Sequence, residues 1–171
     1  TRDELELLER GTGRLTEFLQ SLDLFDSSTF PGQRSVLECL EQIQSAPRAL
    51  VVHGNYLNDA DVAWLKERPH FSVVYCPRTH TYFGHERYPL ETFRNADLRV
   101  VLGTDSRASN PDLRIWRELQ LVAKQFPEIP IADLIAMVTS DAAEAIGFES
   151  GDFSIRPAGA SRNNSQLKLP S

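Results

Sequence analysis

Polar residues that could do chemistry follow three short apolar runs of the chain. His53 comes directly after the first run, and Asp105 comes after the third, behind a Gly-Thr pair. The second run leads into the segment Cys-Pro-Arg-Thr-His, which ends at His80. An imidazole and a carboxylate on neighbouring strand ends can flank a divalent metal, or can orient and deprotonate a water whose pKa the metal has lowered. The pattern therefore indicates a hydrolytic site.

Each of these residues also has an ordinary structural alternative. A histidine after an apolar run is often a structural residue, and an aspartate after Gly-Thr is often the N-cap of the next helix. Of the other histidines, His70 precedes a strand and is expected to be structural, whereas His85 belongs to a solvated loop or lines the entrance of the site. Three polar residues in register on successive strands favour the functional interpretation over the structural one.

The apolar runs have the length and composition of β-strands, at residues 49–52, 71–75 and 98–102. Segments with helical spacing lie between them, at 59–67 and 88–95. Strands and helices that alternate about every 25 residues are typical of parallel βα units, whose strands are covered on both faces. Functional residues gather at the carboxyl ends of such strands. The sequence thus predicts the α/β class, with the three polar residues at one edge of the sheet.

Helical spacing also precedes and follows the strands. A Gly-Thr-Gly element at 11–13 interrupts the first helix, but it has no strand before it and no Lys-Ser/Thr after it, so it is not a phosphate loop. No Gly-rich loop follows any strand, which disfavours a doubly wound nucleotide-binding domain. The remaining helices and loops are predicted at 2–22 (helix), 23–34 (loop), 36–43, 112–126 and 131–146 (helices), and 151–171 (irregular tail).

Composition limits the partners. The chain has 171 residues, 41% of them hydrophobic, and a net charge of -6, which describes one globular domain at most. It is shorter than the roughly 250 residues of a closed eight-stranded barrel. It lacks a Lys/Arg cluster, so nucleic acid and anionic membranes are not expected as partners, and it lacks an apolar run long enough to span a bilayer. A cytoplasmic protein is expected, with Cys39 and Cys76 as thiols rather than disulfide or zinc cysteines.

Four segments of the chain resemble the amidohydrolase superfamily, in the branch of cytosine, guanine and S-adenosylhomocysteine deaminases and triazine chlorohydrolases. VVHGNYL, VVYCPRTHTYFGH and VVLGTDSRASNPDL are similar to the sixth, seventh and eighth strand regions, and TSDAAEAIGF is similar to the helix after the barrel. The resemblance covers about residues 1–157. It implies a partial TIM-type (β/α)8 barrel at 1–150, made of the last three to four βα units and a post-barrel helix, with a truncated tail at 151–171.

The resemblance also implies roles for three residues. His53 matches the histidine that orients and polarises metal-bound water in mononuclear deaminases, or ligates a second metal in binuclear relatives. Asp105 matches a metal ligand that also takes the proton from the attacking water. His80 lies in the loop that faces the substrate and is a candidate substrate contact. The implied cofactor is one divalent metal, zinc or iron, and the implied partner is a small-molecule substrate.

The sequence departs from the family pattern at the metal ligands. The His-x-His pair, the fifth-strand histidine and the His-x-x-Glu element are not in the sequence. Asp105 is therefore the one matched ligand, and His53 is a second only in a binuclear site, whereas zinc needs three or four protein ligands. We expect the chain to be the carboxyl-terminal part of a longer barrel, inactive and without retained metal when isolated. A homo-oligomer is left open for the parent protein.

The parent is expected to hydrolyse a C-N bond. The resemblance favours deamination of a purine-like or other heteroaromatic amine by metal-activated water. A chlorohydrolase of the same family is an alternative, because expulsion of chloride follows the same addition and elimination steps. A noncatalytic truncated remnant is the other alternative.

Overall fold

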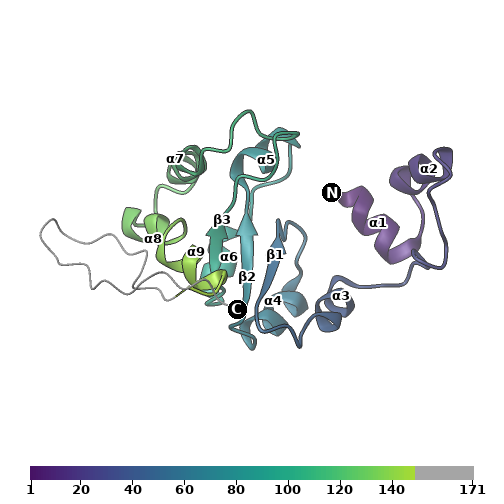
Figure 1. The fold of residues 1–171 in the computed structure, drawn as a ribbon, viewed down its shortest axis with the longest axis horizontal. Coiled ribbons are helices and arrows are strands. Elements are labelled where there is room, and N and C mark those ends of the chain that lie inside the picture. The colour runs from purple at the N-terminus through teal and green to yellow at the C-terminus, as the bar shows by residue number, and fades with distance from the viewer. Residues whose placement is uncertain (149–171) are drawn as a thin grey trace, which may run out of the picture.

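A small parallel sheet forms the centre of the molecule (Figure 1). The computed structural model describes residues 1–148. Its strands β1 (Ala49–Val52), β2 (Phe71–Tyr75) and β3 (Val100–Leu102) lie in the order β1-β2-β3, and both pairs are parallel. Val73 pairs with Val51 on one side and with Val100 on the other, so the three carboxyl ends lie at one edge of the sheet. The predicted strands and the α/β class are confirmed.

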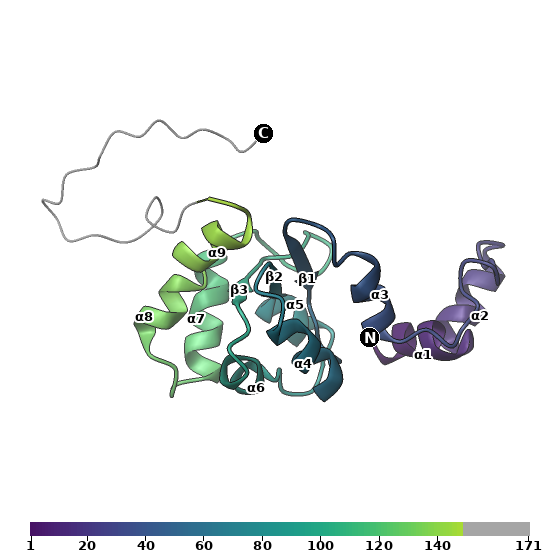
Figure 2. The same cartoon turned by 90° about the horizontal axis from the view of Figure 1, so that it is seen from below.

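Within residues 1–148, helices flank the sheet without enclosing it on every side (Figure 1). One end of the molecule holds the two amino-terminal helices, and the other end holds the last three helices, beyond β3 (Figures 1 and 2). The helices are α1 (Arg2–Arg10), α2 (Arg14–Ser21), α3 (Val36–Gln42), α4 (Asp59–Lys66), α5 (Pro77–Tyr82), α6 (Leu90–Asn95), α7 (Ile115–Gln125), α8 (Ile131–Ala136) and α9 (Ser140–Ala145).

The core lies along β2 and β3. Both strands are almost entirely buried, which explains why their sequences read as continuous apolar runs. Tyr75 of β2 stacks on Tyr88 with 3.8 Å between the ring centroids, and the edge of Phe93 packs against Tyr88. In β1, by contrast, Leu50 and Val52 are 42% and 54% exposed. The expectation that the strands are covered on both faces therefore holds for β2 and β3 and is wrong for β1 within residues 1–148.

Local signals explain where several helices begin and end. Ser35 and Asn58 cap α3 and α4, each in a capping box with the side chain three residues later. Gly11 takes the left-handed conformation, with φ 65°, and ends α1. The Gly-Thr-Gly element therefore separates two helices rather than interrupting one.

Three further predicted segments differ from the structure. The segment that ends at His80 was expected to be a loop and instead forms the short helix α5, with Pro77 at its first position. The helix predicted to begin at 112 begins at Ile115, because a loop extends from β3 to that point. The helix predicted over 131–146 is wrong as one element: Thr139 leaves helical geometry, with φ -129° and ψ -97°, and its hydroxyl donates to the carbonyl of Ile135.

The irregular tail predicted at 151–171 lies outside the described residues. Within residues 1–148, every helix is too short or too polar to cross a membrane.

Candidate active site

His53 ends β1 in a left-handed turn. Its backbone N–H donates to the carbonyl of Val74 at 2.8 Å, so it still pairs with β2, and its own carbonyl accepts a hydrogen bond from the Tyr88 hydroxyl at 2.7 Å. His53 has φ 69° and Gly54 has φ 58°. This backbone region is unfavourable for a histidine, by roughly 1–3 kcal/mol, and is found where the surrounding structure imposes it. The turn fixes the side chain at the strand end, where it is 39% exposed.

Asp105 lies in the loop after β3 and also has a positive φ, of 57°. Its Oδ1 accepts the backbone N–H of Ser106 at 2.7 Å, and its Oδ2 accepts the hydroxyl of Ser109 at 3.0 Å. The Ser109 hydroxyl in turn contacts the Thr79 hydroxyl at 3.0 Å, so the carboxylate is linked to α5. The alternative that Asp105 caps a helix is wrong, because the next helix, α7, is preceded by Arg114.

The surroundings of Asp105 favour its charged form. Burial raises the pKa of this carboxyl, but the hydrogen bonds from Ser109 and Ser106, together with nearby His53, outweigh the burial and hold the pKa below its ordinary value. Asp105 is therefore an anion at neutral pH that still has a free face toward solvent, since 27% of its side chain is exposed.

The structure brings the two predicted catalytic residues together. His53 Nε2 lies 3.8 Å from Asp105 Oδ2. This separation is too long for a direct hydrogen bond, and it is short enough for both atoms to contact one ion or one water. Residues 52 positions apart thus meet because β1 and β3 are parallel and end at the same edge of the sheet.

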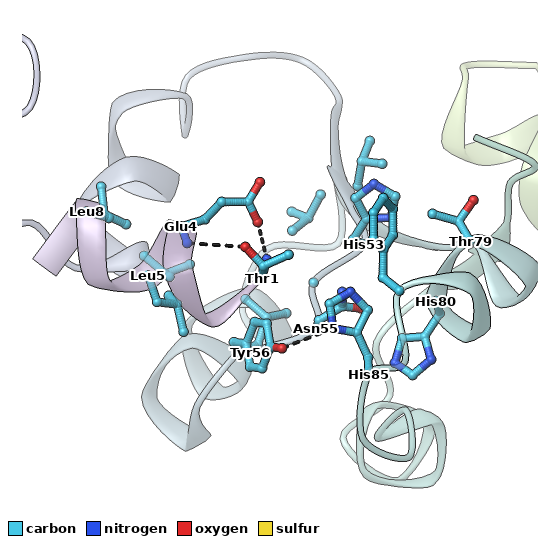
Figure 3. Close-up of a pocket in the computed structure, with 16 residues that line it drawn as sticks. Thr1, Glu4, Leu5, Leu8, His53, Asn55, Tyr56, Thr79, His80 and His85 are labelled. Atoms are coloured by element: carbon cyan, nitrogen blue, oxygen red, sulfur yellow. Dashed lines mark hydrogen bonds and ion pairs between the residues drawn. The ribbon is translucent and has the colours of Figure 1, made fainter. Parts of the chain in front are cut away.

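A pocket of about 510 Å³ opens beside His53 (Figure 3). One side comes from the turn after β1 and from α5 and the loop that follows it, and the other side includes the start of α1 (Figure 3). Both sides mix polar and apolar side chains, and α1 and its cap contribute Thr1 and Glu4 beside two leucines. Its volume is in the range of small-molecule sites. Asp105 is not among the lining residues. The polar lining includes His53, Asn55, Tyr56, Thr79, His80 and His85, and the apolar lining includes Leu5, Leu8, Val36, Leu57 and Phe83.

His80 lines this pocket from α5 and is only 8% exposed. Its ring makes T-shaped contacts with two tyrosine rings, with centroid distances of 5.7 Å to Tyr75 and 5.4 Å to Tyr88. Burial, and to a smaller extent the nearby His85 and His53, lowers the pKa of His80 to about 4. His80 is therefore neutral at physiological pH. Its predicted role as a substrate contact agrees with this position and stays a prediction.

His85 is a further histidine of the pocket. Its Nδ1 is 3.0 Å from the Tyr56 hydroxyl, its ring centroid is 5.1 Å from that of His80, and burial lowers its pKa. Both His85 and Tyr56 line the pocket, so of the two expectations for His85 the position at the site is the one that fits. His70, expected to be structural, has Nε2 3.1 Å from the Gln44 carbonyl, away from the pocket.

His53 and Asp105 are residue types that could bind a metal, and two such residues do not complete a metal centre. His53 and Asp105 present two donor atoms to one space, whereas a zinc ion in a protein takes three or four protein ligands. Among residues 1–148, no group of three or more histidine, cysteine, aspartate or glutamate side chains is placed to hold a metal ion. The donors present do not form a complete site by themselves.

Comparison with known proteins shows the family. Residues 5–155 match the amidohydrolase family, which is most of the chain. The chain therefore belongs to the amidohydrolase family, and the resemblance noted in its strand-end motifs is confirmed, including the deaminase branch.

The curated relatives are named as deaminases. The chain is 32% identical over 108 residues to a 5-methylthioadenosine/S-adenosylhomocysteine deaminase of Halobacterium salinarum, covering 59% of this chain and 25% of the relative. It is 27% identical over 160 residues to the protein of the same name from Natronomonas pharaonis, covering 88% of this chain and 32% of the relative. The chain thus spans about a quarter to a third of the length of these relatives.

Solved deaminase structures share the fold. An adenosine deaminase from Xanthomonas campestris with bound zinc superposes with a TM-score of 0.61 and 25% identity, covering 77% of this chain and 34% of that one. The aminofutalosine deaminase of Helicobacter pylori, in complex with methylthio-coformycin, superposes with a TM-score of 0.69 and 22% identity, covering 85% and 36%.

Proposed function

We propose that this chain is the carboxyl-terminal portion of a metal-dependent deaminase that acts on a purine-like or other heteroaromatic amine. The observation that carries the proposal is the approach of His53 Nε2 to Asp105 Oδ2, 3.8 Å apart, beside a pocket of about 510 Å³. The names of the relatives support the reaction, since each of those described above is called a deaminase.

In the proposed reaction, water adds to the ring carbon that carries the amino group, and the C-N bond then breaks to release ammonia. Asp105 accepts a proton of the attacking water, because its hydrogen bonds keep it ionised at neutral pH. The proton lost by the water ends on the amino group, which leaves as ammonia when the C-N bond breaks. His53 orients the water from the other side. A divalent metal bound in such a site would lower the pKa of the water enough for it to lose a proton near pH 7.

His80 is proposed to bind the substrate rather than to transfer a proton. Its pKa of about 4 leaves it neutral at pH 7, so one ring nitrogen can donate a hydrogen bond and the other can accept one. A neutral donor and acceptor pair suits the ring nitrogens of an uncharged heteroaromatic compound. The apolar lining of the pocket would then cover the rest of the ligand.

For the metal, zinc or iron, we propose Asp105 as one ligand and His53 as a second in a binuclear site. Further ligands are required and are not among the residues gathered here, in line with the share of the relatives that the chain spans. We expect the full natural protein, after dialysis, to retain about one metal ion per chain, and the isolated 171-residue chain to retain almost none. Stoichiometric retention by the isolated chain, measured by elemental analysis, would contradict this proposal.

The activity is tested by ammonia release from the full natural protein. Adenosine, 5-methylthioadenosine, S-adenosylhomocysteine, guanine and cytosine form the substrate panel, and a chlorotriazine reports on the chlorohydrolase alternative through chloride release. Asp105→Asn is expected to lower kcat by at least about a hundredfold, because the proton acceptor is lost.

Asp26→Asn is the matched control, because Asp26 accepts the backbone N–H and the hydroxyl of Ser28 in a similar turn and is not among the pocket residues. A turnover by Asp105→Asn close to that of Asp26→Asn would remove Asp105 from the mechanism. Chloride release without ammonia would favour the chlorohydrolase, and no release of either, with metal bound, would favour a noncatalytic protein.

A further inference from the structure

A carboxylate outside the pocket is completely buried. Glu118 lies in the first turn of α7, and its side chain is 0% exposed. Its two oxygens accept different donors: Oε2 accepts the backbone N–H of Arg78 at 2.9 Å, and Oε1 accepts the side-chain amide of Asn110 at 2.7 Å. The Arg78 guanidinium is 3.8 Å from Oε1, which partly balances the charge.

The two donors belong to the two segments that carry site residues. Arg78 lies at the start of α5, directly before Thr79 and two residues before His80. Asn110 lies in the loop after β3, and the same amide group that reaches Glu118 also donates to the carbonyl of Thr104 at 2.7 Å, directly before Asp105. Glu118 is therefore bonded to both sides of the site without touching the pocket.

We propose that Glu118 is a positioning residue that holds the Asp105 loop against the start of α5. Glu118 thereby fixes the distance between the loop and α5, which the hydrogen bonds from Thr79 to Ser109 and from Ser109 to Asp105 span. This distance sets the position of the Asp105 carboxylate relative to His53. The catalytic consequence rests on the proposed function, whereas the positioning itself does not.

The chemistry of the contacts explains why a carboxylate stands at this place. Two N–H donors approach from different segments, and a carboxylate offers one oxygen to each. Glutamine has a single acceptor oxygen and an amide that can only donate, so one of the two buried donors would lose its partner. Burial raises the pKa of Glu118, because removing the charged carboxylate from water costs free energy. The hydrogen bonds from Arg78 and Asn110 lower the pKa and offset part of this desolvation cost.

A second link in the same region supports the arrangement. The Arg78 guanidinium donates to Asp112 Oδ1 at 2.8 Å, which ties the far end of the β3–α7 loop to α5 as well. The loop is thus held at Asn110 and Asp112 against groups of α5 and α7. Asp105 lies in the part of the loop between β3 and these two attachment points.

The experiment compares Glu118→Gln with Asp61→Asn in the full natural protein. Asp61 is a matched control because it is a carboxylate only 1% exposed that accepts the backbone N–H of Asn58 at 2.9 Å, at the start of α4 and away from the site. Amide hydrogen exchange of Ser106 and Ser109 is measured by NMR. We expect Glu118→Gln to accelerate exchange at both amides by at least about tenfold, and Asp61→Asn to leave it within about twofold of wild type.

Steady-state kinetics separate positioning from general stability. If Glu118 positions Asp105, then Glu118→Gln lowers kcat by about ten- to a hundredfold with KM within about twofold, after correction for the folded fraction. Asn110→Ala, which removes the other end of the same hydrogen bond, is expected to give the same pattern and replaces Glu118→Gln if that variant does not fold.

Each outcome decides the inference. Exchange at Ser106 and Ser109 that is the same in Glu118→Gln and Asp61→Asn overturns it, and so does a kcat that falls equally in both variants. If the wild-type protein releases no ammonia, the proposed function fails, and the exchange data still decide whether Glu118 holds the loop.

Discussion

The hydroxyl pair behind Asp105 allows a quantitative test of the site's architecture. Ser109 donates to Asp105 Oδ2 and lies 3.0 Å from the Thr79 hydroxyl, and the two side chains are only 6% and 3% exposed. Two substitutions probe them: Ser109→Ala removes the hydroxyl that contacts the carboxylate, and Thr79→Val replaces the second hydroxyl with a methyl group of similar size.

The magnitude follows from the contacts that each variant loses. Ser109→Ala removes one hydrogen bond to a carboxylate and leaves the Thr79 hydroxyl buried without this partner, which costs about 1–3 kcal/mol of unfolding free energy. We place the value near 2 kcal/mol, because Asp105 remains partly exposed and water can replace part of the lost bond. Thr79→Val costs about 1 kcal/mol. The double variant no longer has an unpaired hydroxyl at Thr79, so it should cost about 1 kcal/mol less than the sum of the single variants.

The assay is urea unfolding of the four proteins, which form a double-mutant cycle, repeated at several pH values. The hydrogen bonds lower the pKa of Asp105 in the folded state, so their contribution is present above the unfolded pKa of about 3.9 and is lost as pH falls through the lower folded value. The destabilisation caused by Ser109→Ala should therefore be full at pH 7 and should shrink below about pH 4. Thr79→Val should show a weaker trend in the same direction.

Two results would refute this reasoning. Strict additivity of the two substitutions, within about 0.3 kcal/mol, would mean that the hydroxyls do not interact. A cost of Ser109→Ala that is the same at pH 3 and pH 7 would mean that the bond to the charged carboxylate is not what stabilises the folded protein.

The other predictions concern His80 and the backbone beside Asp105. Because burial lowers the pKa of His80 from its ordinary value of about 6.5 to about 4, the unfolded chain binds a proton there before the folded protein does, so stability should fall as pH falls from about 6.5 toward 4. His80→Phe should reduce this slope in thermal unfolding, and an unchanged slope would assign the effect to another group. Gly103→Ala should destabilise the protein by about 1–3 kcal/mol, because a Cβ at this position would lie 2.7 Å from Val74 Cγ1. Wild-type stability of Gly103→Ala in urea would show that the end of β3 can move away from β2.

Local sequence signals were sufficient for most of the framework. The continuous apolar runs of β2 and β3 are recognisable because both strands are buried on both faces, and the cap residues Ser35 and Asn58 mark helix starts because their hydrogen bonds reach only three residues along the chain. The polar residues His53 and Asp105 were identifiable for a related reason, since parallel strands place their carboxyl ends together wherever the chain crosses over.

Local signals failed where tertiary contacts competed with them. The periodicity of 131–146 is that of one helix, but the structure breaks it at Thr139. Two residues earlier, the carbonyl of Met137 accepts the backbone N–H of Leu102 in β3. The segment after β2 contains a proline and polar residues, which favour a loop, yet it forms the short helix α5. One of the first N–H groups of this helix, that of Arg78, donates to Glu118.

The sequence by itself therefore determined the strands, most of the helices, the family and the residues at the strand ends, because these depend on local periodicity and on motifs a few residues long. Only the tertiary structure decided how Asp105 is held, that His80 and His85 share a pocket with His53, and that Glu118 joins two walls of the site. The hydrogen bonds that join the two segments link residues 30 and 40 positions apart, Thr79 with Ser109 and Arg78 with Glu118. No local pattern encodes such pairs, because their hydrogen bonds exist only once the sheet has brought the segments together.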